Sequence, residues 1–260
     1  MRGIILAGGH GTRLYPLTKV MSKQLLPLYD KPMIYYPLST LMLAGIREIA
    51  IICKTEQLEN FRNVLRDGSQ FGVSFTYMIQ EDPKGLPDAF NIASEWIKGR
   101  QVCMILGDNI FFGAGLGRQL GTIDFLSGAL AFAYQVKDPE RFGVVELSET
   151  GNVQTLEEKP TEPKSEFAVT GLYFFDETVS ERTRNLLPGP RGETEILELL
   201  KSYLNENKLK VNVLPRGTAW LDTGTFESLH DAASFIKIMQ ERTGLQIGNP
   251  EEIARVQGWI

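Results

Sequence analysis

The chain has 260 residues, of which 27 are basic and 32 are acidic, so its formal net charge at pH 7 is −5. This balance excludes a general affinity for nucleic acid unless basic residues gather in a local patch. With 43% hydrophobic and 23% charged residues, the composition indicates an ordered globular protein. No apolar run approaches the ~20 residues that a membrane-spanning helix needs. Cys53 and Cys103 lie inside apolar runs, which predicts reduced core thiols and a cytoplasmic protein.

The first half of the sequence alternates between strand and helix patterns. Short apolar segments predict buried strands, at residues 2–7, 48–53, 73–80 and 102–106. Helical spacing of apolar residues predicts helices, at residues 34–44, 57–66 and 86–98. This alternation is typical of parallel strands joined by right-handed crossovers. We therefore expect an α/β fold that is Rossmann-like, with a mostly parallel central sheet and α-helices on both faces.

After residue 108 the pattern changes to closely spaced strands. These are predicted at residues 129–136, 143–147, 153–158, 168–175 and 208–214. Helices are predicted at residues 178–187, 194–206 and 225–242. Residues 148–152, Ser-Glu-Thr-Gly-Asn, predict a hairpin turn. We expect this part to be an inserted β/α portion of a single domain over residues 1–260, with a nucleotide-binding first half and a substrate-recognition second half.

A glycine-rich loop, residues 8–14, follows the first predicted strand and reads Gly-Gly-His-Gly-Thr-Arg-Leu. Glycines at such a place let the backbone approach a phosphate and turn N–H groups toward it. The loop is not a dinucleotide fingerprint, because Leu14 stands where a glycine or alanine is needed, and no Gly-Lys-Ser/Thr run makes it a P-loop. Arg13 and Lys23 add two cations, which favours a polyphosphate site over a simple tight turn. The alternative for both cations is a solvated surface position.

Two aspartates follow apolar stretches. Asp108 comes after the predicted strand at residues 102–106, and ligands bind at the carboxyl edge of open α/β sheets. Asp222 precedes a predicted helix, so helix capping is its alternative role, although Thr225 is better placed for that. Carboxylates suit Mg²⁺, which keeps few protein ligands and takes the others from water and phosphate. The sequence therefore predicts a metal–polyphosphate site.

These motifs, in their order, resemble the nucleotidyltransferases that make nucleotide sugars. The resemblance begins with the glycine loop and the run Ser22-Lys23-Gln24-Leu25-Leu26-Pro27. It covers nearly the whole chain, through residues 30–33, 106–111, 138–145, 156–160, 169–173, 219–225 and 250–254. The single motifs are short, but their order and spacing identify the chain as a member of this sugar nucleotidyltransferase family.

The resemblance implies a Mg²⁺-dependent reaction of dTTP with glucose 1-phosphate that gives dTDP-glucose and pyrophosphate. That reaction would be the first step towards dTDP-deoxysugars such as dTDP-rhamnose. The catalytic residues would be Arg13, Lys23, Asp108 and Asp222, and the two aspartates would hold the Mg²⁺ ion. No general base is expected, because the attacking sugar phosphate is already ionised at pH 7, so catalysis would be positioning and electrostatics. The family also implies a homo-oligomer, in particular a tetramer.

The resemblance assigns binding residues position by position. Residues 1–110 would mainly bind the nucleotide, through Gly8, Gly9, Gly11, Thr12, Gln24, Gln80 and Gly85. Residues 111–260 would mainly bind the sugar phosphate, and that ligand would meet Asn109, Gly143, Glu158, Lys159, Val169, Tyr173 and Arg191. Glu158 suits a sugar, because a carboxylate accepts two hydroxyl hydrogen bonds. The alternative for residues 157–159 is an exposed charge run.

Some positions depart from the family pattern. Residues 85–89 read Gly-Leu-Pro-Asp-Ala where Gly-Leu-Ala-Gln-Ala is common, so Asp88 adds a negative charge near the expected nucleotide. Residues 191–198 lack a Thr-Asp pair of the family, and His10 and Phe226 stand where a small residue and a histidine are usual. The chain ends before the C-terminal segment of longer members, so their feedback regulation is not assumed.

Two alternatives to thymidylyl transfer therefore stay open. The first is a related pyrimidine nucleotidyltransferase that uses UTP or another sugar 1-phosphate. The second is a non-catalytic nucleotide-sugar-binding or regulatory paralogue, which would bind its ligand without releasing pyrophosphate.

Overall fold

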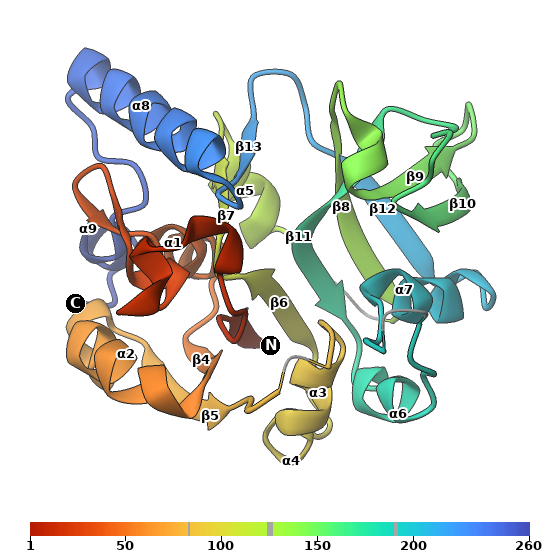
Figure 1. Ribbon diagram of the computed structural model, residues 1–260, viewed down its shortest axis with the longest axis horizontal. Coiled ribbons are helices and arrows are strands. Elements are labelled where there is room, and N and C mark those ends of the chain that lie inside the picture. Colours follow the sequence, from red (N-terminus) through yellow and green to blue (C-terminus); the bar gives the residue numbers. More distant parts are fainter. Residues whose placement is uncertain (83, 124–126, 190–191) are drawn as a thin grey trace. The chain divides into compact units, whose positions relative to one another are not determined.

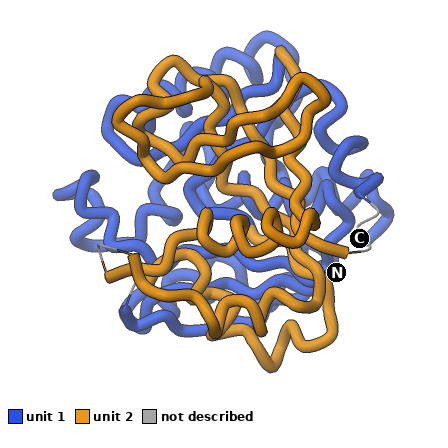
Figure 2. Tube along the Cα trace, turned by 90° about the vertical axis from the view of Figure 1, so that its right-hand side faces the viewer, with its two compact units in different colours: residues 1–82, 105–123, 217–260 blue, residues 83–104, 124–216 orange. Residues whose placement is uncertain are grey.

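The chain forms two compact units in the computed structural model, which describes residues 1–82, 84–123, 127–189 and 192–260 (Figure 2). Unit 1 comprises Met1–Asp82, Ile105–Ile123 and Gly217–Ile260, and unit 2 comprises Pro83–Met104 and Asp124–Arg216. Each unit is assembled from segments that are distant in sequence. Within the described residues, no helix is both long and apolar enough to cross a lipid bilayer.

Unit 1 contains the parallel strands that the first half of the sequence predicts (Figure 1). Strand β1 (Arg2–Leu6) pairs with β4 (Glu48–Cys53), which pairs with β5 (Ser74–Ile79). The end of β6 (Val102–Leu106) lies beside β1. β1 and β4 are apolar and buried along nearly their whole length, as expected for strands covered on both faces. Because β1, β4 and β5 run in the same direction, their carboxyl ends lie at one edge of the sheet.

The helices of unit 1 come from both ends of the chain. Helix α1 (Tyr35–Leu43) is buried along most of its length, whereas α2 (Leu58–Leu65) buries only one side. Helix α5 (Leu116–Gly121) and the C-terminal α9 (Pro250–Val256) both contact α1. The longest helix of the described chain is α8 (Phe226–Thr243). The last segment of the sequence therefore completes a core begun by the first.

A separate antiparallel pair of unit 1 joins β7 (Asn109–Phe112) to β13 (Ala219–Asp222). Ile110 of β7 belongs to one apolar cluster with Ala232 and Ile236 of α8. The same cluster includes residues of the short hairpin β2 (Pro27–Leu28) and β3 (Lys31–Pro32) and the residues after it, namely Leu28, Met33 and Tyr36. The pair is thus anchored by packing as well as by its backbone hydrogen bonds.

Unit 2 contains the closely spaced strands of the second half. β11 (Phe167–Phe175) pairs in antiparallel fashion with β8 (Ala129–Gln135) and with β9 (Gly143–Leu147), and β9 pairs with β10 (Val153–Glu158). β12 (Leu209–Val213) pairs with β8 in parallel. Its helices are α3 (Asp88–Ile92), α4 (Ser94–Ile97), α6 (Val179–Arg184) and α7 (Ile196–Leu204).

The predicted fold class is confirmed: the protein is a mixed α/β structure with helices and a mostly parallel central sheet. The strands at residues 48–53, 102–106, 143–147 and 153–158 match residue for residue. The hairpin turn is also confirmed, since the Ser148 N–H donates to the Asn152 carbonyl at 2.8 Å. Short apolar segments bounded by polar residues are thus reliable strand signals in this chain.

One helix prediction is wrong in extent. The helix expected at residues 86–98 is two short helices, α3 and α4, which meet at Ala93. There ψ is 4°, which takes the backbone out of the helical repeat, although the Ile97 N–H still donates to the Ala93 carbonyl at 2.9 Å. Neither glycine nor proline stands at this break, so apolar spacing alone does not reveal it.

Candidate active site

The candidate nucleotide loop follows β1 at the carboxyl edge of the unit 1 sheet. The Ala7 N–H donates to the Ile52 carbonyl at 2.7 Å, which extends the β1–β4 pairing to the start of the loop. Gly8 faces Gln80, which follows β5, and a Cβ at position 8 would lie 2.5 Å from Gln80 Oε1. Gln80 is only 3% exposed. The structure therefore brings together two residues that are predicted to bind the nucleotide, and a side chain at position 8 would displace the Gln80 amide.

The rest of the loop turns at Gly11, where φ is 61°, and begins a short 3-10 helix over Thr12–Leu14. The Thr18 hydroxyl donates to the Gly11 carbonyl at 2.7 Å. Leu14 is fully buried, whereas Arg13 is exposed. Leu14 thus anchors the loop in the core and leaves the guanidinium of Arg13 accessible to an anion.

His10 contacts a cation that the sequence analysis missed. Nζ of Lys54 lies 2.6 Å from His10 Nδ1, and Lys54 directly follows β4 at the same edge of the sheet. Next to this pair, a side chain at Gly9 would meet open space. No motif marks Lys54, because its role in the loop depends on a contact with a residue 44 positions away.

Lys23 and Gln24 lie in a short 3-10 helix over Lys23–Leu25. The Ser22 hydroxyl donates to Gln24 Oε1 at 2.6 Å, and Gln24 is buried. A Cβ at Gly107 would lie 2.9 Å from Gln24 Cγ. Gln24 therefore packs against the turn after β6, and this turn carries Asp108.

Asp108 is held by two neighbours. The Lys23 ammonium contacts its Oδ2, and Asn109 Nδ2 donates to its Oδ1 at 2.9 Å. The Lys23 and Asp108 side chains are 11% and 25% exposed. Burial raises the pKa of the Asp108 carboxyl, but the Lys23 charge and the hydrogen bonds from Lys23 and Asn109 outweigh burial, so the pKa lies below its usual 3.8. The group is therefore an ionised carboxylate at neutral pH.

The β7–β13 pair brings Asp222 close to Asp108. Asn109 and Asp222 lie directly opposite each other in the two strands. The Thr223 hydroxyl donates to the Asp108 carbonyl at 2.9 Å, which ties the two chain segments together beyond the strand ends. The two predicted metal ligands therefore lie at the same end of one strand pair.

Asp222 does not cap helix α8. That position belongs to Thr225, whose hydroxyl accepts from the Ser228 N–H at 3.2 Å, while the Ser228 hydroxyl accepts from the Thr225 N–H at 3.0 Å. This reciprocal arrangement is a capping box. The capping alternative for Asp222 is thereby removed.

Asn109 uses both ends of its amide inside the protein. It is 4% exposed; its Oδ1 accepts from Trp220 Nε1–H at 2.6 Å, and its Nδ2 donates to Asp108. Trp220 is a second residue for which sequence reasoning gave no role. The signal available was its place in the motif of residues 219–225, two positions before Asp222.

In unit 2, three of the predicted sugar-phosphate residues lie at one end of the β9–β10 pair. Gly143 and Glu158 are directly opposite each other, and Lys159 follows with a φ of 46°. The Lys159 ammonium lies 3.5 Å from Glu158 Oε1. A Cβ at Gly143 would lie 2.9 Å from Leu197 Cδ1, so this strand end has no room for a side chain.

Val169 and Tyr173 lie on β11 and are both buried. Burial, and secondarily the charge of Glu158, raise the pKa of the Tyr173 hydroxyl, which is therefore a neutral phenol. Arg191, the last of the residues predicted to bind the sugar phosphate, lies outside the described residues.

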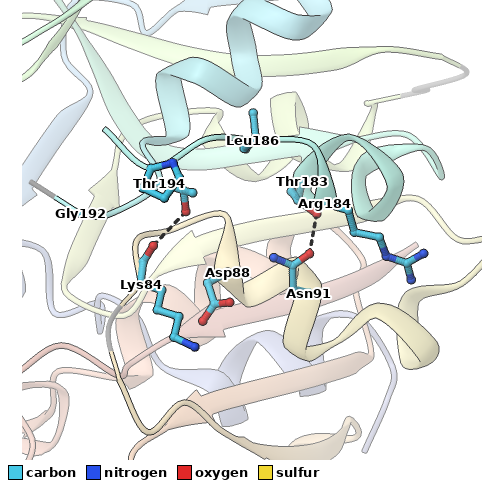
Figure 3. A pocket seen from close by; sticks show the side chains of 9 residues that line it. Lys84, Asp88, Asn91, Thr183, Arg184, Leu186, Gly192 and Thr194 are labelled. Atoms are coloured by element: carbon cyan, nitrogen blue, oxygen red, sulfur yellow. Dashed lines mark hydrogen bonds between the residues drawn. The ribbon is translucent and has the colours of Figure 1, made fainter. Parts of the chain in front are cut away.

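Within unit 2, the segment at Lys84 and Gly85 is hydrogen-bonded to Thr194 (Figure 3). The Lys84 carbonyl accepts from both the N–H and the hydroxyl of Thr194, each at 2.9 Å. φ of Gly85 is 104°, and a Cβ there would overlap the Thr194 carbonyl oxygen and lie 2.7 Å from its nitrogen. A second link joins the same two segments, since the Thr183 hydroxyl donates to Asn91 Oδ1 at 3.0 Å. Gly85 is thus required by the backbone of Thr194.

These links border a pocket of about 470 Å³ in unit 2. The side chain of Asp88, which departs from the family pattern, is drawn between Lys84 and Asn91 in Figure 3. The described lining residues are Lys84, Asp88, Asn91, Thr183, Arg184, Leu186, Pro188, Gly192 and Thr194. Two cations, Lys84 and Arg184, and one acid, Asp88, therefore line the same pocket.

Comparisons with known proteins decide the family. Residues 2–238 match the family model described as nucleotidyl transferase. A glucose-1-phosphate thymidylyltransferase of Neisseria meningitidis is 54% identical over 261 residues, which cover 100% of this chain and 91% of that protein. The chain belongs to the nucleotidyl transferase family. This nucleotidyl transferase is also 54% identical to the glucose-1-phosphate thymidylyltransferase of Mycobacterium tuberculosis, over 100% of this chain and 90% of that protein.

Solved structures agree with this assignment. A Bacillus anthracis protein assigned as a glucose-1-phosphate thymidylyltransferase, in complex with sucrose, superposes with a TM-score of 0.83 at 39% identity, over 90% of this chain and 94% of that one. A UDP-glucose pyrophosphorylase complexed with UDP-glucose gives a TM-score of 0.80 at 23% identity, over 92% of this chain and 98% of that one. The second likeness concerns the fold alone. The family predicted from the motifs is thereby confirmed.

Proposed function

We propose that this nucleotidyl transferase moves a thymidylyl group from dTTP to glucose 1-phosphate, forming dTDP-glucose and releasing pyrophosphate. The observation that carries the proposal is the 54% identity, over the whole chain, to relatives named for this activity. The cluster of Lys23, Asp108 and Asp222 in unit 1 supports it, because a reaction between two polyanions needs charged groups at one place.

In this reaction a phosphate oxygen of glucose 1-phosphate forms a bond to the α-phosphorus of dTTP. The bond from that phosphorus to the bridging oxygen breaks, and its electron pair leaves with pyrophosphate. The attacking oxygen is already ionised at pH 7, so the protein supplies positioning and charge and no general base. The exposed guanidinium of Arg13 suits the leaving pyrophosphate.

Lys23 would change partners during this reaction. Its ammonium contacts the Asp108 carboxylate in the described state, and it would exchange that carboxylate for the α-phosphate when dTTP binds. Lys23 therefore balances the negative charge of the Asp108 carboxylate before the substrates arrive. When dTTP binds, a charge-assisted hydrogen bond from Lys23 to phosphate replaces the one to the carboxylate.

The residues present fit a Mg²⁺ ion. Asp108 and Asp222 are two carboxylates at one end of the β7–β13 pair, and Mg²⁺ in nucleotide sites is often bound by one or two carboxylates with phosphates and water as the other ligands. When bound, the ion would neutralise phosphate charge and lower the repulsion between the two substrates. We propose Asp108 and Asp222 as the residues that hold it.

The substrates would divide between the predicted residues as follows. The glycine loop, Gln24, Gln80 and Gly85 would bind the nucleotide, mainly within residues 1–110, and the groups at the end of β9 and β10 would bind the sugar phosphate, mainly within residues 111–260. The Glu158 carboxylate and the neutral Tyr173 hydroxyl suit sugar hydroxyls, and the Lys159 ammonium suits the phosphate.

We also propose that the protein is a homo-oligomer, a tetramer by family resemblance, which light scattering coupled to size-exclusion chromatography tests directly. A cytoplasmic place of action is part of the proposal. The buried free thiols of Cys53 and Cys103 support it, because unpaired cysteines persist in reducing compartments.

Pyrophosphate release is the test of function. The purified chain would be assayed with dTTP or UTP and a panel of sugar 1-phosphates in the presence of Mg²⁺, with reactions lacking one substrate as controls. The proposal expects the highest kcat/KM with dTTP and glucose 1-phosphate. A preference for UTP would instead establish the related nucleotidyltransferase that uses UTP. Ligand binding without pyrophosphate release from any pair would establish the non-catalytic paralogue.

A further inference from the structure

Three side chains of unit 1 form a continuous hydrogen-bonded series, which we call the relay. Trp220 Nε1–H donates to Asn109 Oδ1 at 2.6 Å, and Asn109 Nδ2 donates to Asp108 Oδ1 at 2.9 Å. Asn109 is 4% exposed and Trp220 is 8% exposed. The relay therefore leads from the buried face of β13 to a carboxylate proposed as a metal ligand.

The chemistry of Trp220 decides which end of the amide faces Asp108. An indole nitrogen can donate a hydrogen bond but cannot accept one. It therefore requires the oxygen of Asn109 on its side, which turns the amide nitrogen toward the carboxylate. With the opposite orientation, two N–H groups would face each other at Trp220, and the amide oxygen would face the Asp108 carboxylate.

The amide in turn limits rotation of the Asp108 side chain. Its Oδ1 accepts from Asn109, and its Oδ2 contacts Lys23, so each oxygen has a separate donor. The Lys23 contact is the one that the proposed reaction would release, whereas the Asn109 contact lies inside the protein. When Lys23 turns to phosphate, the relay and the hydrogen bond from the Asp108 backbone would remain to hold the carboxylate.

We propose that Trp220 is a positioning residue, which acts through Asn109 to orient the Asp108 carboxylate toward the metal–nucleotide complex. This inference rests on the proposed function of the same site. The register of the strands supports it, because β13 carries both Trp220 and Asp222, and β7 begins with Asn109. One strand therefore bears one proposed metal ligand and orients the other.

The test replaces Trp220 by Phe, which keeps an aromatic ring and removes the N–H donor. We expect kcat for pyrophosphate release to fall about 10- to 100-fold, in proportion to the loss of a hydrogen bond at a buried polar group, while KM for dTTP changes less than threefold. The matched control is Trp259→Phe, also in unit 1, where the indole ring instead stacks against Arg47 at 5.2 Å. That control should keep its kcat within twofold of the parent.

A metal-binding measurement separates positioning from general damage. Mn²⁺ binding would be followed by electron paramagnetic resonance with dTTP present and sugar phosphate absent, so that no turnover occurs. Trp220→Phe should weaken Mn²⁺ binding about tenfold in folded protein, and Asn109→Ala should weaken it similarly. The double variant should be no weaker than Asn109→Ala alone, because both changes break one relay.

Several results would overturn the inference. One is that Trp220→Phe keeps both its kcat and its Mn²⁺ affinity within twofold of the parent. Another is that the losses of Mn²⁺ affinity caused by the two substitutions add up in the double variant. If Trp220→Phe does not fold, Asn109→Ala decides by the same two measurements. Absence of pyrophosphate release from the parent chain would instead refute the proposed function, and the Mn²⁺ measurements would still test the relay.

Discussion

Substitution of Gly85 by alanine offers a direct test of how unit 2 is held together. Gly85 has a φ of 104°, and a Cβ at this position would overlap the carbonyl oxygen of Thr194. Relief of that overlap requires the two segments to separate. Separation would break the two hydrogen bonds that the Lys84 carbonyl accepts from Thr194, each at 2.9 Å.

The expected magnitude has two parts. The first is the strain of a non-glycine residue at positive φ, about 1–2 kcal/mol. The second is the loss of two hydrogen bonds, about 0.5–1.5 kcal/mol each. Gly99→Ala isolates the first part, because Gly99 also belongs to unit 2 and has a φ of 66°, but nothing lies within 4 Å of its Cβ position.

The assay is thermal unfolding followed by circular dichroism, with the two variants and the parent in the same buffer. Gly85→Ala should be less stable than Gly99→Ala by about 1–3 kcal/mol, which corresponds to a Tm roughly 2–12 °C lower. Equal Tm values for the two variants would refute the reasoning. They would mean that the Lys84–Thr194 link contributes nothing or that the segment moves without cost.

Three further predictions concern single side chains. Asp108→Asn should lower turnover about 100-fold or more, with Tm within a few degrees of the parent. Chelation of Mg²⁺ should reversibly abolish the activity of the parent. Full activity in either case contradicts the metal assignment. Burial raises the pKa of the Asp176 carboxyl, but hydrogen bonds from Thr178 and Gly128 outweigh it and lower the pKa below 3.8. The stabilisation is thus present above pH ~4 and lost as pH falls below that value, so Asp176→Asn should cost about 1–3 kcal/mol at pH 7 and progressively less in acid, and a pH-independent difference would exclude this origin. Thr225→Ala should lower stability by about 1 kcal/mol through loss of the helix cap, measured by denaturant unfolding, whereas Thr225→Ser should leave it nearly unchanged.

Local sequence patterns were sufficient to predict a helix or strand where burial alone defines that element. The strand at residues 48–53 is a run of apolar residues after one glutamate, and its bounds are those of the structure. β7 and β13 were not predicted, because each has only four residues and its partner lies about a hundred positions away. Pairing of that kind depends on the whole fold and leaves no periodic signal in either segment.

The same limit applies to the candidate site. The sequence places Lys23 beside a glycine loop and Asp108 after a strand, and the structure brings the two into contact. The sequence does not reveal that Lys54 contacts His10 or that Trp220 donates to Asn109, since both contacts join distant segments. Side chains whose partners are defined by long-range packing were therefore the ones missed.

The placement of β7 and β13 along the sequence links the two units thermodynamically. The segment Asp124–Arg216 of unit 2 lies in the sequence between β7, which ends at Phe112, and β13, which begins at Ala219. If that segment were unfolded, pairing of β7 with β13 would have to close a loop of its length, at an entropic cost of about 4 kcal/mol. Folding of unit 2 lowers this cost, because it shortens the flexible part of the loop. Destabilisation of unit 2 should therefore weaken the alignment of Asp108 with Asp222, even for substitutions remote from both carboxylates.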